Sequence, residues 1–180
     1  MGIGPLIKVP AATAQEVCER FDVTREAKSL LRSDMTPLQF MEALAMKKLY
    51  VESIDFLAHA LPPREGIWWG CLCLQHARGG TLSPAEKAAC SAAVNWLIKP
   101  TEENRLAAKA PGESLGVSSP AGVLAIAAAG GMPPPGPFAH AKAVAMSVKL
   151  SALAGAPSGI IQTQRSYLQL GVGVAAGKFA

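Results

Sequence analysis

Residues 57–74 read LAHALPPREGIWWGCLCL and include the most continuous apolar run of the best-patterned part of the chain. The part from Ile67 to Leu74 has no polar face, which predicts a helix buried on all sides. Pro62 and Pro63 end the helix that precedes it. Because two of the three tryptophans lie here, we expect the rest of the domain to be built around this segment.

Composition and local start signals predict an all-α fold. Half of the residues are apolar and only 6% are aromatic, which favours closely packed helices over a β-sandwich. We expect about seven or eight helices in an irregular bundle or a short solenoid of antiparallel helical hairpins. The core is predicted around Trp68, Trp69, Leu72 and Trp96. Capping residues predict helix starts after Thr13, Thr36, Ser83, Thr101, Ser119 and Ser158.

The chain is expected to form one helical domain over residues 13–170. A loose N-terminal arm covers residues 1–12, and a stiff proline-rich linker, residues 132–137, lies inside the domain. Residues 171–180 are predicted to be a flexible tail. The tail begins GVGVAAG, but no strand precedes it, so the glycines do not fit a dinucleotide-binding loop.

The charge distribution argues against nucleic acid as a partner. The net charge is +4, and no Asp or Glu follows Glu113. The last part of the chain carries only the cations Lys142, Lys149, Arg165 and Lys178, which are too dispersed to grip phosphates. No run reaches the roughly 18 apolar residues that a membrane span needs.

The four cysteines, Cys18, Cys71, Cys73 and Cys90, are expected to be free thiols in the cytoplasm, because no secretory signal is recognisable at the N-terminus. Cys71, Cys73 and His76 resemble a metal-binding group. However, residues two apart on a helix point about 200° away from each other, so we expect no metal and no cofactor.

No local catalytic motif stands out. His59 is interpreted as a hydrogen-bonding residue near a helix end, and Glu102 and Glu103 as partners of a helix dipole. A non-catalytic binding protein is therefore the leading hypothesis. The alternative is a small enzyme whose site is assembled from scattered residues such as His59, Glu65 and Arg105; it predicts a polar cleft with converging ionisable groups.

Three segments carry a resemblance to a known family: Phe56 to Pro62, Trp68 to Cys71 and Pro100 to Arg105. In the order and spacing of these segments, the chain resembles an uncharacterised family of helical domains from bacteria, specifically proteobacteria, over about residues 36–170. The family has no assigned catalytic residues. The resemblance implies a cytoplasmic accessory protein that acts as an adaptor or in a chaperone-like way. Some members look as if they are encoded in type VI secretion gene clusters.

The expected partner is another protein, such as a secretion-system component or effector, and homo-oligomerisation stays open. We expect docking on the segment Phe138 to Ala154, where Lys142 and Lys149 have no acidic residue nearby in the sequence and are free to meet an acidic partner. The alternative is that this segment is an ordinary core helix packed against residues 36–98.

Overall fold

The computed structural model describes residues 5–79, 81–132 and 135–178. This part of the chain contains ten α-helices, one 3-10 turn and no strand, so the all-α prediction is confirmed. The helices are α1 (Ala14–Cys18), α2 (Arg25–Lys28), α3 (Pro37–Met46), α4 (Tyr50–Ala60), α5 (Pro63–Arg78), α6 (Pro84–Ile98), α7 (Glu102–Leu115), α8 (Pro120–Ala128), α9 (Ala139–Leu153) and α10 (Ile160–Ala175).

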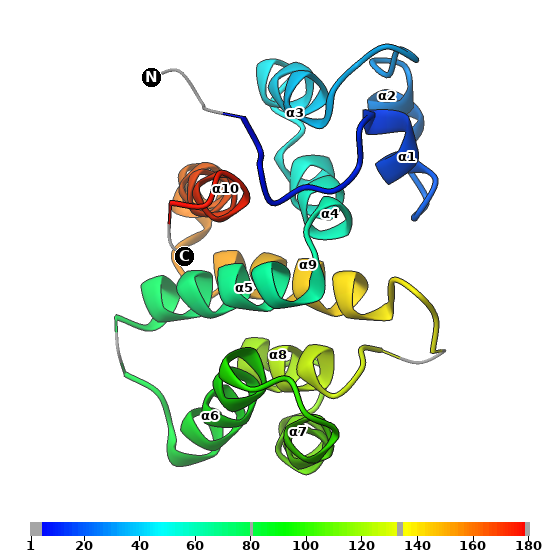
Figure 1. The fold of residues 1–180 in the computed structure, drawn as a ribbon. Coiled ribbons are helices and arrows are strands. Elements are labelled where there is room, and N and C mark those ends of the chain that lie inside the picture. Colours follow the sequence, from blue (N-terminus) through cyan, green and yellow to red (C-terminus); the bar gives the residue numbers. More distant parts are fainter. Residues whose placement is uncertain (1–4, 80, 133–134, 179–180) are drawn as a thin grey trace.

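The helices form an irregular bundle of three layers (Figure 1). Helices α5 and α9 lie side by side in the middle layer. Helices α6, α7 and α8 cover one side of it, with α8 against both α5 and α9. Helices α1 to α4 and α10 lie on the other side, where α4 and α10 contact the middle layer directly.

Local capping chemistry sets most of the helix starts. The side chains of Thr13, Thr36 and Ser83 each accept a hydrogen bond from the backbone three residues later, within complete capping boxes. Thr101 and Ser119 cap α7 and α8 as predicted. The start predicted at Ser158 is wrong: a 3-10 turn, Pro157–Gly159, leads into α10 at Ile160. Helix α2, which Thr24 caps, is an addition to the helices predicted from the sequence.

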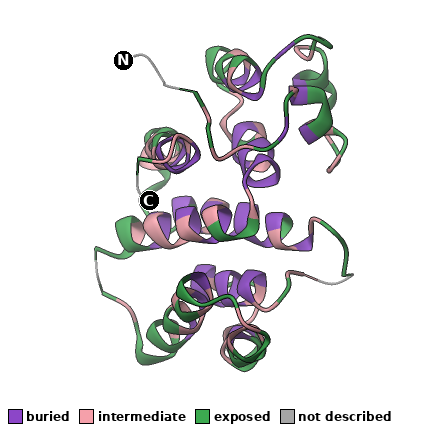
Figure 2. Ribbon diagram, viewed as in Figure 1, coloured by how far each residue is buried: buried purple, intermediate pink, exposed green. Residues whose placement is uncertain are grey.

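The prediction that the tryptophan-containing helix is buried on all sides is wrong. In α5, Trp69 is fully buried, whereas Trp68 and Leu72 are half-buried and the last turn is partly exposed (Figure 2). Trp96 on α6 is half-buried as well. Neighbouring helices cover only part of the circumference of α5, so Trp69 is the one tryptophan of the three that is fully buried, while Trp68 and Trp96 pack against the core from its edge.

Residues 171–175 are not the flexible tail that the sequence predicts. They complete α10, and Gly171, Gly173, Val174 and Ala175 are buried there. A Cβ atom on Gly171 would lie 2.6 Å from both Leu57 Cδ2 and Trp69 Cε2, so the glycine permits a close approach of α10 to the core.

The arm before α1 runs back to the end of α10. The backbone N–H of Lys8 donates to the carbonyl oxygen of Ala175 at 2.9 Å. The proline-rich linker, residues 132–137, lies partly outside the described residues, and its last three residues, Pro135, Gly136 and Pro137, are exposed. Within the described residues, no helix has the length and apolar character to cross a membrane.

Candidate functional site

A large cleft lies between α10 on one side and α3 and α4 on the other, with a volume of about 860 Å³. Two helix faces line it. The α10 face repeats at helical spacing, as does the α3 face. The α3 residues are Leu38, Met41, Glu42 and Ala45. The α10 residues include Arg165, Leu168, Gln169 and Val172 at that spacing, together with Ser166, Leu170 and Gly173. Tyr50 and Ser53 of α4 and His76 of α5 also line the cleft.

Both walls of this cleft are fixed to the core. On the α10 wall, the indole Nε1 of Trp69 donates to the carbonyl oxygen of Tyr167 at 2.7 Å, and the bond is buried. On the α3 wall, Phe40 packs edge-on against Phe56 of α4, with ring centroids 5.0 Å apart. Because each wall is seated by a buried aromatic contact, the cleft is a preformed feature of the fold.

The rim of the cleft is charged. Arg165 and Lys178 lie exposed on the α10 side and Glu42 lies exposed on the α3 side. The ion pairs formed among residues 5–79, 81–132 and 135–178 include none of these three side chains. An occupant could therefore meet two cations on one wall and a carboxylate on the other.

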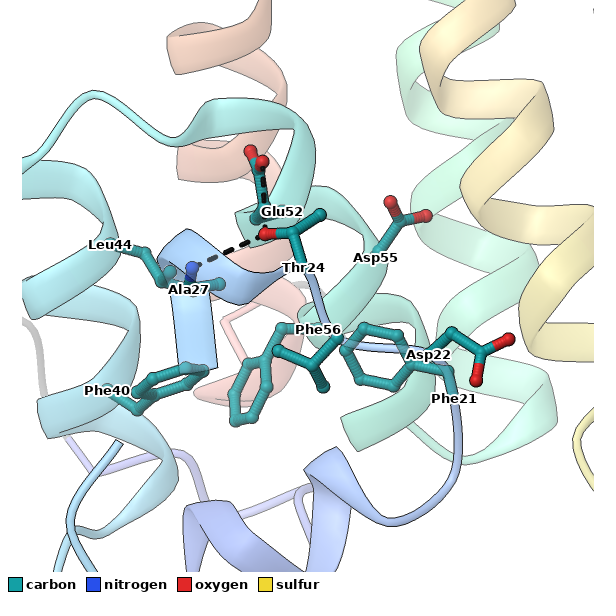
Figure 3. A pocket seen from close by; sticks show the side chains of 10 residues that line it. Phe21, Asp22, Thr24, Ala27, Phe40, Leu44, Glu52, Asp55 and Phe56 are labelled. Atoms are coloured by element: carbon teal, nitrogen blue, oxygen red, sulfur yellow. Dashed lines mark hydrogen bonds between the residues drawn. The ribbon is translucent and has the colours of Figure 1, made fainter. Parts of the chain in front are cut away.

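A second pocket lies beside α2, among Phe21, Phe40 and Phe56 (Figure 3). Its volume of about 20 Å³ has room for roughly one water molecule. In Figure 3 the carboxyl groups of Asp22 and Glu52 point away from each other, and Glu52 accepts a hydrogen bond from Thr24 at 3.4 Å. The pocket is too small for a substrate and its acidic groups do not converge.

A buried polar cluster surrounds His59 at the end of α4. The ring is 4% exposed and stacks on Phe21, with ring centroids 4.5 Å apart. Its Nδ1 lies 2.7 Å from the carbonyl oxygen of Asp55, and its Nε2 is buried with no hydrogen-bond partner among the described residues. Burial lowers the pKa of His59, while the hydrogen bond to Asp55 opposes that shift.

Lys149 is paired, contrary to the prediction that it is free. Its Nζ atom donates to the carboxylate of Asp55 at 2.7 Å, across 94 residues of sequence. Lys142 is exposed. The helix that carries both, α9, buries most of its residues in the middle layer, which confirms the alternative of an ordinary core helix. Partner binding at Lys142 and Lys149 stays a prediction, but its premise that Lys149 is unpaired does not hold.

The residues of the enzyme hypothesis have separate partners. His59 bonds to Asp55, and Glu65 lies 4.0 Å from the Nζ atom of Lys8. Arg105 binds Glu102 through two hydrogen bonds and donates to the carbonyl oxygen of Ala129 at 2.6 Å. No hydrogen bond or ion pair of the described residues joins the three side chains.

The cysteines are all free thiols, and Cys73 is buried. Burial raises the pKa of Cys71 to about 12, that of Cys90 to about 11 and that of Cys73 well above its usual value. These thiols stay protonated at neutral pH and are poor nucleophiles. No three His, Cys, Asp or Glu side chains within the described residues are arranged to hold a metal ion.

The sequence does not predict the cleft, for two reasons. The sequence assigns Val172 of the α10 wall to a flexible tail, and the cap at Thr36 predicts a helix without specifying which of its side chains line a cleft. Leu168 and Val172 are four residues apart, and this helical spacing is the signal that could have found the wall.

The chain belongs to a family of unknown function (DUF6931), whose model matches residues 40–175. The match begins inside α3 and ends at the last residue of α10, whereas α1 and α2 precede it. No curated protein and no solved structure matches the chain.

Proposed function

We propose that this protein is a non-catalytic binding protein, an adaptor or chaperone-like accessory that takes a helical segment of another protein into the cleft between α3 and α10. The observation that carries the proposal is the pair of opposed helix faces. Each wall includes residues at positions i, i+3, i+4 and i+7, from Leu38 on α3 and from Arg165 on α10, and a groove between two such faces can receive an amphipathic helix.

The size of the cleft fits this occupant. An α-helix with its side chains is about 10 Å wide and rises 1.5 Å per residue, so about 860 Å³ holds roughly seven residues, or two turns. Val172 on one wall and Leu38 on the other are half-buried and supply apolar contact, above the buried Leu168 and Met41.

The charges of the rim define the chemistry of the partner. Arg165 and Lys178 favour acidic residues on the side of the incoming helix that faces α10. Glu42 favours a basic or neutral residue on the side that faces α3. The proposed partner segment is therefore an amphipathic helix with an acidic edge.

The proposed setting is the bacterial cytoplasm, with a type VI secretion component or effector as the partner. The setting is supported by the family resemblance in the segments Phe56 to Pro62, Trp68 to Cys71 and Pro100 to Arg105. The four free cysteines support the cytoplasmic location, since thiols persist in a reducing compartment.

Filling the cleft tests the proposal. Ala45 is exposed and lines the cleft, so Ala45→Trp should block it without disturbing the core. Ala107 is exposed on α7, away from the cleft, and Ala107→Trp is the matched control. Affinity-tagged variants are used to capture partners from host cells, and the leading partner is then purified for titration.

We expect Ala45→Trp to weaken the binding of the purified partner at least about tenfold, which is about 1.4 kcal/mol of binding free energy. Ala107→Trp should bind the partner as tightly as the parent protein does. Equal binding by both variants would place the interface elsewhere. Enrichment of no protein over an untagged control would count against an adaptor role.

A further inference from the structure

We propose that His59 is a protonation switch that releases the connection between α1 and α2 from α4 in mildly acidic solution. This connection, residues 19–24, is held to α4 at two points beside the histidine. Arg20 donates from Nη1 to the carbonyl oxygen of His59 at 2.8 Å, and Phe21 stacks on its ring. The Arg20 guanidinium also lies 5.3 Å from the ring centroid of Phe138, at the start of α9.

The geometry selects the neutral histidine. A carbonyl oxygen only accepts hydrogen bonds, so the Nδ1 atom, 2.7 Å from the carbonyl of Asp55, carries the hydrogen. The lone pair of the neutral ring is then on Nε2, which is buried and has no partner among the described residues. Protonation places the added hydrogen on Nε2, where none of these residues offers an acceptor, so a buried charged donor is left unsatisfied.

Two neighbouring cations add to this cost. Arg20 from the α1–α2 connection and Lys142 from α9 both disfavour a positive charge on His59. His140 of α9 is close enough for its own pKa to be lowered by His59, after the larger effect of burial. The carboxylate of Asp55 favours the charged ring, but it is engaged by Lys149 at 2.7 Å.

Opening the α1–α2 connection relieves the charged state. Phe21 is half-buried and stacks on one face of the ring, so its side chain lies between that face and solvent only in part. When Phe21 and Arg20 move away, water solvates the imidazolium, and one of the two cations that disfavour its charge, Arg20, is removed. The proton comes from solvent, and closure returns it to solvent.

Hydrogen exchange of the full chain at pH 7.5 and pH 5.5, corrected for intrinsic rates, measures the release. The ordinary pKa of histidine is 6.5, so at pH 5.5 the open form is favoured by up to about tenfold. We expect protection of peptides that cover residues 14–30 to fall toward that limit, while peptides from α8 keep theirs.

Two variants assign the effect to one histidine. His59→Gln keeps a polar side chain that does not titrate, and it should remove the pH dependence of residues 14–30. His76→Gln, at an exposed histidine on α5, should retain it. Equal pH dependence in His59→Gln and the parent protein, or none in the parent, would overturn the proposal.

A titration of the parent protein followed by NMR keeps the test independent of how well His59→Gln folds. The amide signals of residues 19–24 should move with the same apparent pKa as the His59 ring. Amides that do not follow the ring would also overturn the proposal.

Discussion

The two sides of the α5–α9 layer are packed by different means. On the α6–α8 side, small residues bring backbones together: a Cβ atom on Gly122 would lie 2.6 Å from the carbonyl oxygen of Gly116. On the α1–α4 and α10 side, large side chains such as Trp69, Tyr167 and Phe56 fill the space.

This difference decides where binding features arise. Backbones in close contact leave no room for a groove, and eight of the nine residues of α8 are buried and apolar or glycine. Large side chains hold helices further apart and leave irregular gaps between them. The cleft and the polar cluster around His59 both lie on that side.

The largest expected effect separates Trp69 from the other tryptophans. Trp69→Ala should cost about 3–5 kcal/mol of unfolding free energy, because a fully buried ring and its bond to Tyr167 are lost. Trp96→Ala should cost clearly less, since Trp96 is half-buried. Urea melts measure both. Equal costs would contradict this difference and favour the sequence-based prediction of a core around both Trp69 and Trp96.

Glycine substitutions compare the two sides directly. Gly122→Ala on α8 and Gly171→Ala on α10 should each cost about 1–3 kcal/mol, because backbone atoms or a fixed indole ring occupy the space of the new methyl group. Gly155→Ala is the control, with nothing among the described residues within 4 Å of its Cβ position. Were Gly122→Ala as harmless as Gly155→Ala in urea melts, the close backbone contact at α8 would be refuted.

Acidification should destabilise the side that contains His59. The pKa values of His59 and His140 are lowered chiefly by burial, so the unfolded chain binds more protons below about pH 6.5. The free energy of unfolding therefore falls as the pH drops from 7.5 through 6.5 toward the folded pKa values. Each histidine contributes a loss of at most about 1.4 kcal/mol for every pH unit between its ordinary pKa and its lowered pKa.

Urea melts at pH 7.5, 6.5 and 5.5 measure this decline. His59→Gln should make the free energy of unfolding depend less steeply on pH, whereas His76→Gln should leave the slope unchanged. A decline that persists in full in His59→Gln would assign it to other groups. None of the three histidines lies on α6, α7 or α8.

The smallest expected effect concerns the ion pair between Asp55 and Lys149. The side chain of Lys149 is 34% exposed and that of Asp55 is 27% exposed, so a double-mutant cycle with alanine should give a coupling of about 0.5–1 kcal/mol. Lys109 and Glu113, each 64% exposed at 3.9 Å, should give less. A coupling no larger than that of the exposed pair would mean that the Asp55 contact does not fix α9 to α4.

The helical class and most helix starts follow from the sequence alone, because a capping bond joins residues only three positions apart. Thr13, Thr36 and Ser83 are satisfied by their own neighbours in the chain. The family match likewise follows from sequence, over residues 40–175.

Local signals misjudge the end of the chain. Gly171 and Gly173 lower the intrinsic helix propensity, and the sequence therefore predicts a flexible tail. The close approach of Gly171 to Leu57 and Trp69 compensates for that cost, and both residues are more than 100 positions away in the sequence. For the same reason Val172 of the α10 wall is predicted to lie in a flexible tail.

Which side chains are free, paired or buried depends on the tertiary structure. Lys149 meets Asp55 across 94 residues, and the indole of Trp69 meets the Tyr167 carbonyl across 98. Trp68 and Trp69 are neighbours in the sequence, yet only Trp69 faces the core fully. Such contacts depend on how helices are oriented around one another, and no spacing within a single helix specifies that orientation.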